Sequence, residues 1–296
     1  MQMLKKTLMI MLLFPFLGWE TSKAQEISAD DLKFLKAEEK ELVVLADSMF
    51  HAFMPEIRSD YNIKFVKRLR TALQTPNSYY YTFPTLSNYV NFLSPEAGGF
   101  RIINWNVPVT DNTLRYYGAI QLEQAALKLF PLVDYSTEIK EKDYDSVYSN
   151  TKWFGCLYYK IITQEVQGQR VYTLFGLNAE AMVSNKKLLD VLVMTDKGPV
   201  FGYPLFSMNS LGGSEFYRKR FVMEYKKDVQ ASLNYDKEMK MIYFDKLVSQ
   251  VNDPNRKYTY VPSGQYDGFR WEEDHWQYVS DFMPALNLKD GEAPTK

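Results

Sequence analysis

The fold is decided in residues 152–206, KWFGCLYYKIITQEVQGQRVYTLFGLNAEAMVSNKKLLDVLVMTDKGPVFGYPLF, where apolar and aromatic blocks alternate with short polar turns. Short apolar runs bounded by turn residues are typical of strands, so this stretch predicts strands at 153–162, 170–177, 188–194 and 199–206. Gln167-Gly168 and Asp196-Lys197-Gly198 supply tight turns between neighbouring runs. The stretch therefore predicts an antiparallel meander.

Two amphipathic helices are predicted ahead of the meander. Apolar residues recur at steps of three and four across 28–53, with Ser28 or Asp30 as the N-cap, and Pro55 is predicted to end this helix. A second apolar stripe steps by four across 56–73, with basic residues on the opposite face. With the aromatic connector that follows, these helices form a predicted helical segment over residues 25–98.

After Gly99 the apolar period changes from about four to about two. The pattern predicts a hairpin of 100–107 and 114–122 about Asp111-Asn112, a short strand at 128–134 and a surface loop at 139–150. Beyond the meander it predicts a flexible connection at 207–215, strands at 221–225, 229–235 and 239–247, a turn at 262–264, and a closing hairpin of 268–271 and 275–279.

These elements predict an α+β protein of mostly antiparallel β structure. The helical cap precedes an antiparallel β domain at 99–283, whose meander forms a sandwich or a barrel, with a partial β-propeller as the alternative. The polar tail at 284–296 is predicted to be flexible.

The first residues show the pattern of a secretory signal peptide over 1–24. Lys5 and Lys6 precede an apolar stretch at 7–18, and Ser22-Lys23-Ala24 offers small residues for cleavage after Ala24. The apolar stretch is shorter than the ~20 residues that cross a bilayer. We therefore expect a soluble periplasmic or secreted protein with no membrane span after cleavage.

Charge and cysteine content argue against a nucleic-acid-binding protein and against a protein stabilised by disulfides within its chain. The chain has a net charge of −1, and its basic clusters at 64–70 and 218–220 are predicted to be solvated faces or strand-edge charge, so nucleic acid is not an expected partner. Cys156 is the single cysteine, so no disulfide forms within the chain. Its apolar neighbours predict a small, buried core residue.

No motif for a known chemistry is present in the sequence. There is no paired Cys or His-x-x-x-His for zinc, no Gly-x-Ser-x-Gly elbow, no phosphate-cradling loop and no dinucleotide fingerprint. We therefore predict no catalytic residue, no metal and no cofactor, and the sequence favours a non-enzymatic protein.

Aromatic residues make up 16% of the chain, which suits half-buried strands and also sugar-binding surfaces. In the doublets Tyr116-Tyr117 and Tyr158-Tyr159, one ring is predicted to lie in the core and the other to be exposed, because neighbours on a strand point to opposite faces. The candidate binding residues lie near turns or in the closing hairpin: Trp105, Trp271, Trp276, Asp267, Glu272 and His275.

Three segments carry a resemblance to known proteins: FRIINW at 100–105, KWFGCLYYKI at 152–161 and YDGF at 266–269. In these segments the chain resembles a group of uncharacterised exported β-rich proteins of Gram-negative bacteria. The resemblance covers most of the chain after the helical cap. It implies export and β structure, and it transfers no activity, ligand or site residue.

Together these observations predict an exported binding or structural protein of the cell envelope that works through a surface on an envelope protein or a glycan. The alternative is a carbohydrate-binding protein or a carbohydrate-active hydrolase, motivated by the aromatic content and by the carboxylates at Asp267 and 272–274.

Overall fold

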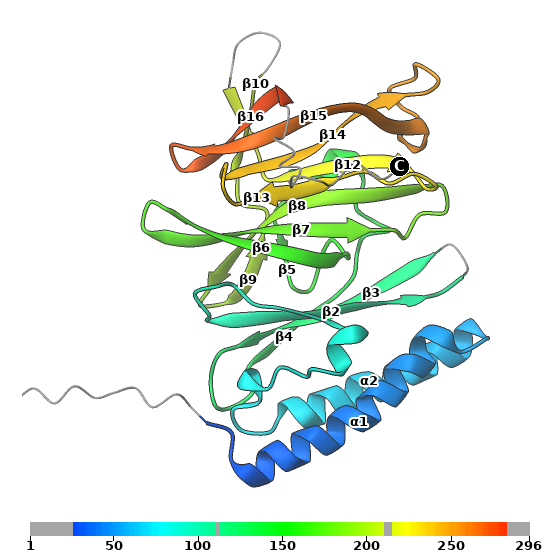
Figure 1. Ribbon diagram of the computed structural model, residues 1–296, viewed down its shortest axis with the longest axis vertical. Helices are drawn as coiled ribbons and strands as arrows, with labels where there is room; N and C mark the ends of the chain where they lie inside the picture. Colours follow the sequence, from blue (N-terminus) through cyan, green and yellow to red (C-terminus); the bar gives the residue numbers. More distant parts are fainter. Residues whose placement is uncertain (1–25, 111–112, 210–214, 283–296) are drawn as a thin grey trace, which may run out of the picture.

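The computed structural model describes residues 26–110, 113–209 and 215–282, which form two helices followed by three mostly antiparallel sheets. The helices and the sheets lie on one another in four layers (Figure 1). The predicted α+β class is confirmed; the sheets stack face to face as in a sandwich, and the described ranges contain no closed barrel. The predicted signal peptide, the Asp111-Asn112 turn and the tail at 284–296 lie outside the described residues.

Two helices, α1 (Ala29–His51) and α2 (Pro55–Leu73), form the first layer. α1 begins where the sequence predicts, because Ser28 Oγ accepts a hydrogen bond from the Asp31 backbone N–H at 3.1 Å. Pro55 does not end this helix. α1 already ends at His51, and Pro55 is the first residue of α2, where its missing N–H has no helical partner to lose.

A buried carboxylate holds the connector between α2 and the first sheet, which contains the short 3₁₀ turns η1 (Ser78–Tyr80) and η2 (Leu86–Asn88). Glu39 of α1 accepts a hydrogen bond from the Tyr81 hydroxyl and others from the backbone N–H groups of Thr85, at 2.7 Å, and Leu86, at 2.9 Å. Charge-assisted hydrogen bonds of this kind compensate the loss of hydration of a buried carboxylate. Glu39 therefore fixes the connector against the helical layer.

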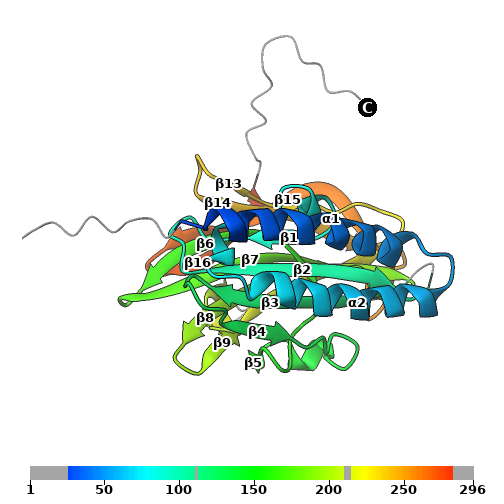
Figure 2. The same cartoon turned by 90° about the horizontal axis from the view of Figure 1, so that it is seen from below.

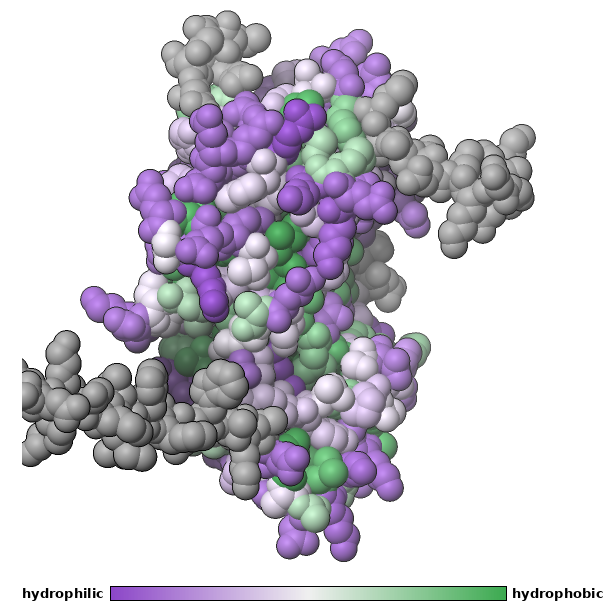
Figure 3. Space-filling model, turned by 60° about the vertical axis from the view of Figure 1, so that its left-hand side comes forward, coloured by the Kyte–Doolittle hydropathy of each residue, from purple (hydrophilic) through white to green (hydrophobic). Residues whose placement is uncertain are grey.

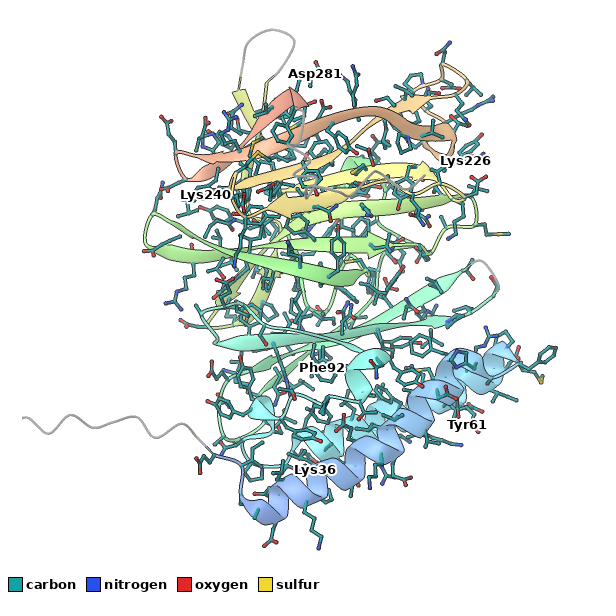
Figure 4. All side chains as sticks on the ribbon, viewed as in Figure 1. Lys36, Tyr61, Phe92, Lys226, Lys240 and Asp281 are labelled. Carbon is teal, nitrogen blue, oxygen red and sulfur yellow. The ribbon has the colours of Figure 1, made fainter. Side chains whose placement is uncertain are left out.

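The first sheet forms the second layer. Its strands follow the chain order: β1 (Asn91–Leu93), β2 (Phe100–Pro108), β3 (Leu114–Leu122) and β4 (Leu129–Leu132). The predicted hairpin is confirmed as β2–β3, and β1, within the predicted helical segment, pairs with β2. Ile103 and Trp105 face the helices and Ile102 and Ile120 face the second sheet, as strand alternation requires. Phe92 of β1 lies between this sheet and the helices (Figure 4).

The second sheet contains the meander. Its strands in spatial order are β5 (Tyr148–Ser149), β9 (Gly198–Phe201), β8 (Ser184–Thr195), β7 (Gln169–Asn178) and β6 (Leu157–Val166), and β12 (Arg220–Lys226) also pairs with β8. The predicted turns are confirmed: Gln167 and Gly168 have φ of 49° and 78°, and Gly198 has φ of 124°. The predicted antiparallel order from β6 to β9 is therefore confirmed.

The third sheet lies farthest from the helices. Its spatial order is β11 (Glu215–Arg218), β10 (Phe206–Asn209), β16 (His275–Phe282), β15 (Tyr260–Glu272), β14 (Met241–Ser249) and β13 (Leu233–Asp236). The closing hairpin is confirmed as β15–β16, with Trp271 opposite Trp276. β10 and β16 are parallel, and every other pair in this sheet is antiparallel.

Several boundaries differ from the prediction. The strand predicted at 199–206 is divided, because β9 ends at Phe201 and the chain passes Pro204 before β10 begins in another sheet. The predicted flexible connection at 207–215 includes most of β10 and the start of β11. The predicted loop at 139–150 contains the turn η3 (Glu141–Asp143) and β5. Pro262 lies inside β15 instead of in a turn, and a further 3₁₀ turn, η4 (Lys257–Thr259), precedes that strand.

Aromatic-rich cores join the sheets. Between the second and third sheets, Phe175, Phe269 and Trp276 belong to one buried core, and Trp276 Nε1 donates a hydrogen bond to Thr173 Oγ1 at 2.9 Å. Between the first and second sheets, Cys156 is fully buried, as predicted, and burial raises the pKa of its thiol. The tyrosine doublets are split as predicted: Tyr116 and Tyr158 are buried, Tyr117 is half-buried and Tyr159 is exposed.

A buried ion pair connects β8 and β12. Arg220 Nε lies 2.9 Å from Asp190 Oδ2, its Nη2 donates to Asp190 Oδ1 at 2.9 Å, and both side chains are fully buried. Arg220 Nη1 also donates to Tyr144 O at 2.7 Å, and the guanidinium lies 4.9 Å from the centroid of the Tyr148 ring. The prediction of a solvated cluster at 218–220 is wrong for Arg220, since a bidentate carboxylate partner allows a guanidinium to be buried.

Candidate functional site

The six candidate residues predicted from sequence lie in three separate places. Trp105 lies on β2, beneath the helices. Asp267 lies on β15, beside a hollow between β12, β14 and β15. The other four lie where β15 turns into β16, with Trp271 opposite Trp276 and Glu272 opposite His275.

Trp105 is held from both sides. Its indole Nε1 donates a hydrogen bond to Asn62 Oδ1 of α2 at 2.9 Å. Its ring stacks on Tyr117 at a centroid distance of 5.9 Å and meets the Phe65 ring edge-on at 5.2 Å. Only 4% of the residue is exposed. Trp105 therefore offers no free face for sugar stacking.

Asp267 is committed to the third sheet. Its Oδ2 accepts a hydrogen bond from the Tyr278 hydroxyl at 2.7 Å, and its Oδ1 accepts one from the Asp281 backbone N–H at 2.9 Å. The adjacent hollow, of about 360 Å³, is also lined by Asp245 and Glu224. Asp245 accepts a hydrogen bond from the Ser232 backbone N–H, and Glu224 accepts one from the Ser184 hydroxyl. These carboxylates serve as acceptors for neighbouring protein groups.

The hairpin residues divide between core and surface. Trp276 is buried at 1% exposure, and Trp271 packs edge-on against it with ring centroids 5.0 Å apart. On the opposite face, His275 Nδ1 lies 2.9 Å from Glu273 O, and the His275 ring meets Tyr217 edge-on at 5.4 Å. Glu272 is exposed and lies 3.5 Å from the Arg270 guanidinium. The hairpin is thus a packed corner with charged residues on its outer face.

A larger hollow lies between the helical layer and the edge of the first sheet. Viewed from the helical side, β4 lies beyond the edge of α2 (Figure 2). Side chains of α2, β3 and β4 line a hollow of about 640 Å³ there, which we call the α2–β4 groove.

The wall of the α2–β4 groove is one flank of α2, formed by Val66, Leu69, Arg70 and Leu73. These positions recur at three- and four-residue steps and so share one side of the helix. Val66 is 41% exposed, while Leu69 and Leu73 also belong to the core beneath the helices. The wall is apolar except at its rim, where the Arg70 side chain extends.

The floor of the groove consists of the helix-facing side chains of β3 and β4 and one residue of the segment that joins them: Tyr117, Ala119, Leu127, Leu129 and Pro131, with Ile103 and Trp105 beneath α2. Ala119 stands opposite Ile103 on one side and Pro131 on the other, so the smallest side chain lies between larger ones. This contrast in side-chain size produces the hollow.

Positive charge lies at the rim of the groove. The Arg70 guanidinium makes no hydrogen bond or ion pair with the part of the chain that the structure describes. Arg115 lies beside the Tyr117 hydroxyl: burial raises the pKa of Tyr117, and Arg115 opposes this rise. An apolar hollow with a cationic rim suits a molecule with an apolar body and an anionic end.

The rest of the described surface offers no metal site and no membrane-spanning helix. On the face drawn in Figure 3, hydrophilic side chains dominate, and apolar patches appear near the middle and over the helical end. Residues 26–110, 113–209 and 215–282 contain no cluster of three or more side chains suited to a metal ion. No helix in these ranges is long and apolar enough to cross a membrane.

Sequence reasoning did not find the groove. The apolar stripe predicted for the second helix includes Leu69 and Leu73 but leaves Val66 and Arg70 on the solvent side. One signal was present: Tyr117 and Ala119 alternate with core residues on a predicted strand, so their shared face had to meet something. What meets it depends on where α2 crosses the sheet.

Comparisons with protein families, with curated proteins and with solved structures found no match to this chain.

Proposed function

We propose that this protein is an exported, non-enzymatic binding protein of the cell envelope that holds a single-chain amphiphile with an anionic head in the α2–β4 groove. The observation that carries the proposal is an apolar hollow of about 640 Å³ with the Arg70 guanidinium at its rim, which has no ion-pair partner among the described residues. Small-molecule sites are usually concave and mostly apolar, with a volume of roughly 300–1,000 Å³ and a few oriented polar groups.

Export of the chain is part of the same proposal. It is supported by the charged start at Lys5 and Lys6, the apolar stretch at 7–18 and the small-residue cleavage pattern before Gln25. A protein in the envelope has access to amphiphiles that partition into membranes. Radiolabelling of the chain in cells, followed by fractionation, tests this step, and a full-length product retained in the cytoplasm would contradict it.

The groove sets an expected affinity. A fatty acid such as oleate has about 20 non-hydrogen atoms, which at ~0.3 kcal/mol per atom correspond to ~6 kcal/mol and a dissociation constant on the order of tens of micromolar. The chain lies along Ala119, Leu129 and the flank of α2, and the carboxylate meets the Arg70 guanidinium. Oleate is the probe that tests both contacts.

The experiment is a titration of the purified protein with oleate, followed by calorimetry below the concentration at which oleate aggregates. Ala119→Leu fills the floor of the groove and is expected to weaken binding about tenfold or more, because a leucine occupies the space of the ligand chain. Ser280→Leu is the matched control: it adds the same side chain to an exposed strand position of the third sheet and is expected to leave binding unchanged.

The head group is tested separately. Arg70→Gln is expected to weaken oleate binding about two- to fivefold, the range of an exposed ion pair, and to leave the binding of oleyl alcohol unchanged. Saturable oleate binding that is equally strong in Ala119→Leu and Ser280→Leu would place the ligand elsewhere. An absence of binding by the unmodified protein would refute the proposal.

A further inference from the structure

The corner between α1 and α2 presents apolar side chains to solvent. Phe53 is 94% exposed, Met54 49% and Ile57 41%. Val109, which directly follows β2, is 44% exposed. Single exposed apolar residues are common on protein surfaces, but a group of them at one site indicates an interaction surface.

Arg58 joins the two segments that carry these side chains. Its Nε donates a hydrogen bond to Ala52 O at 2.6 Å, next to Phe53, and its Nη1 donates to Pro108 O at 3.5 Å, next to Val109. Pro55 restricts the backbone at the start of α2. The corner is therefore a preformed surface, which we call the apolar corner: Phe53, Met54, Ile57 and Val109.

The apolar corner is convex. Figure 1 shows the α1–α2 corner and the neighbouring ends of β2 and β3 reaching out at the same end of the molecule. A convex group of side chains needs a partner that can deform around it or that has a matching cavity. A lipid bilayer meets the first condition without any shape complementarity.

We infer that the apolar corner docks on a lipid bilayer. Its four side chains expose a few hundred Å² at most, whereas each partner in a standard protein–protein interface buries ~800 Å². Interfacial insertion needs no such area, since each apolar side chain gains free energy simply by leaving water. The area of the corner thus favours a bilayer over a second copy of the chain.

Charges beside the corner are mixed in sign. Asp47, Glu56 and Asp60 lie near His51 and Arg58 on the adjoining turns of the two helices. Anionic lipids attract clusters of Lys and Arg, and this set has no excess of them. Docking is therefore driven by apolar contact and does not require anionic lipid. It also stands independently of what the α2–β4 groove binds.

Flotation of the purified protein with vesicles tests this inference. The protein is expected to associate with vesicles of phosphatidylcholine alone and with vesicles that also contain phosphatidylglycerol, to a similar extent at low and high salt. The double variant Phe53→Ser, Met54→Ser is expected to lower the partition coefficient at least about tenfold. Val44→Ser, which removes a 62% exposed residue from α1 away from the corner, is the matched control and should have no effect.

The outcomes separate this inference from the proposed ligand. The double variant is expected to keep its helical circular dichroism and its affinity for oleate, because neither substitution reaches the core or the groove. Absence of association with both kinds of vesicle would overturn the inference. So would association only with phosphatidylglycerol vesicles, an equal loss in Val44→Ser, or dimers in light scattering that the double variant abolishes.

Discussion

Replacing Asp190 with alanine is expected to destabilise the protein strongly. The substitution leaves Arg220 fully buried without its bidentate carboxylate, although its hydrogen bond to Tyr144 O at 2.7 Å remains. Removing one partner of a buried ion pair costs about 3–5 kcal/mol, because the remaining charge stays out of water. Both side chains are fully buried, so solvent screening does not reduce this figure.

The assay is urea unfolding followed by tryptophan fluorescence, with thermal unfolding as a second readout. At about 2–4 °C per kcal/mol for a chain of this size, the melting temperature is expected to fall by roughly 6–20 °C. The double variant Asp190→Leu, Arg220→Met removes both charges and keeps apolar volume in the core. It is expected to lose less stability than Asp190→Ala.

The pair also has a structural consequence. Arg220 on β12 bonds Asp190 of β8 and Tyr144 O in the segment before β5. Loss of the ion pair therefore loosens an edge of the second sheet. A cost below about 1 kcal/mol for Asp190→Ala would refute the reasoning, since it would mean that water reaches the guanidinium. A double variant less stable than the single variant would show that the pair contributes net stability.

Glu39→Ala is expected to cost about 2–4 kcal/mol in chemical denaturation, since three hydrogen bonds to a buried carboxylate are lost; a cost equal to that of an exposed glutamate would contradict this. Burial raises the pKa of Tyr225 to about 12, above the unfolded value of about 10. The stability that protonated Tyr225 contributes is therefore fully present below pH 10, and the free energy of unfolding falls by ~1.4 kcal/mol per pH unit as the pH rises toward 12. Tyr225→Phe should make the free energy of unfolding, measured by urea titration at alkaline pH, depend less steeply on pH. Gly198→Ala should lower the melting temperature more than Gly168→Ala. Both glycines have positive φ, but a Cβ at Gly198 would lie 2.9 Å from Phe130 Cε1, whereas a Cβ at Gly168 would meet no atom within 4 Å. Equal losses would show that the Phe130 ring moves aside at no cost.

Local patterns predicted the elements of this fold well. Ser28 marked the start of α1, and Gln167-Gly168 fixed the β6–β7 hairpin, because both signals act within a few residues. Strand alternation correctly separated Tyr116 from Tyr117 and Tyr158 from Tyr159. Such features depend on interactions between residues close together in the sequence.

Long-range pairing limited the rest. The chain leaves the second sheet at Pro204, and only the three-dimensional structure shows that β10 then pairs in parallel with β16, about 70 residues later. Trp105 was a candidate binding residue because it is near a turn. Trp105 is two residues from each of the apolar residues Ile103 and Val107, so the three side chains share one face of the strand, the face that α2 covers.

The α2–β4 groove depends on how two layers are offset, which no local pattern contains. Arg70 on a helix normally indicates a solvated face, and Ala119 on a strand indicates little. Their meaning changes once α2 leaves β4 uncovered and Ala119 lies between Ile103 and Pro131. The site thus arises from packing rather than from a motif.

The central claim is that the groove is the binding site, and methyl NMR of the protein titrated with oleate tests it most directly. The methyl signals of Ala119, Leu129 and Val66 are expected to shift with one saturable binding isotherm, while those of Val191 and Leu233, in the core between the second and third sheets, stay in place. Saturation with the three groove methyls unmoved would contradict the account.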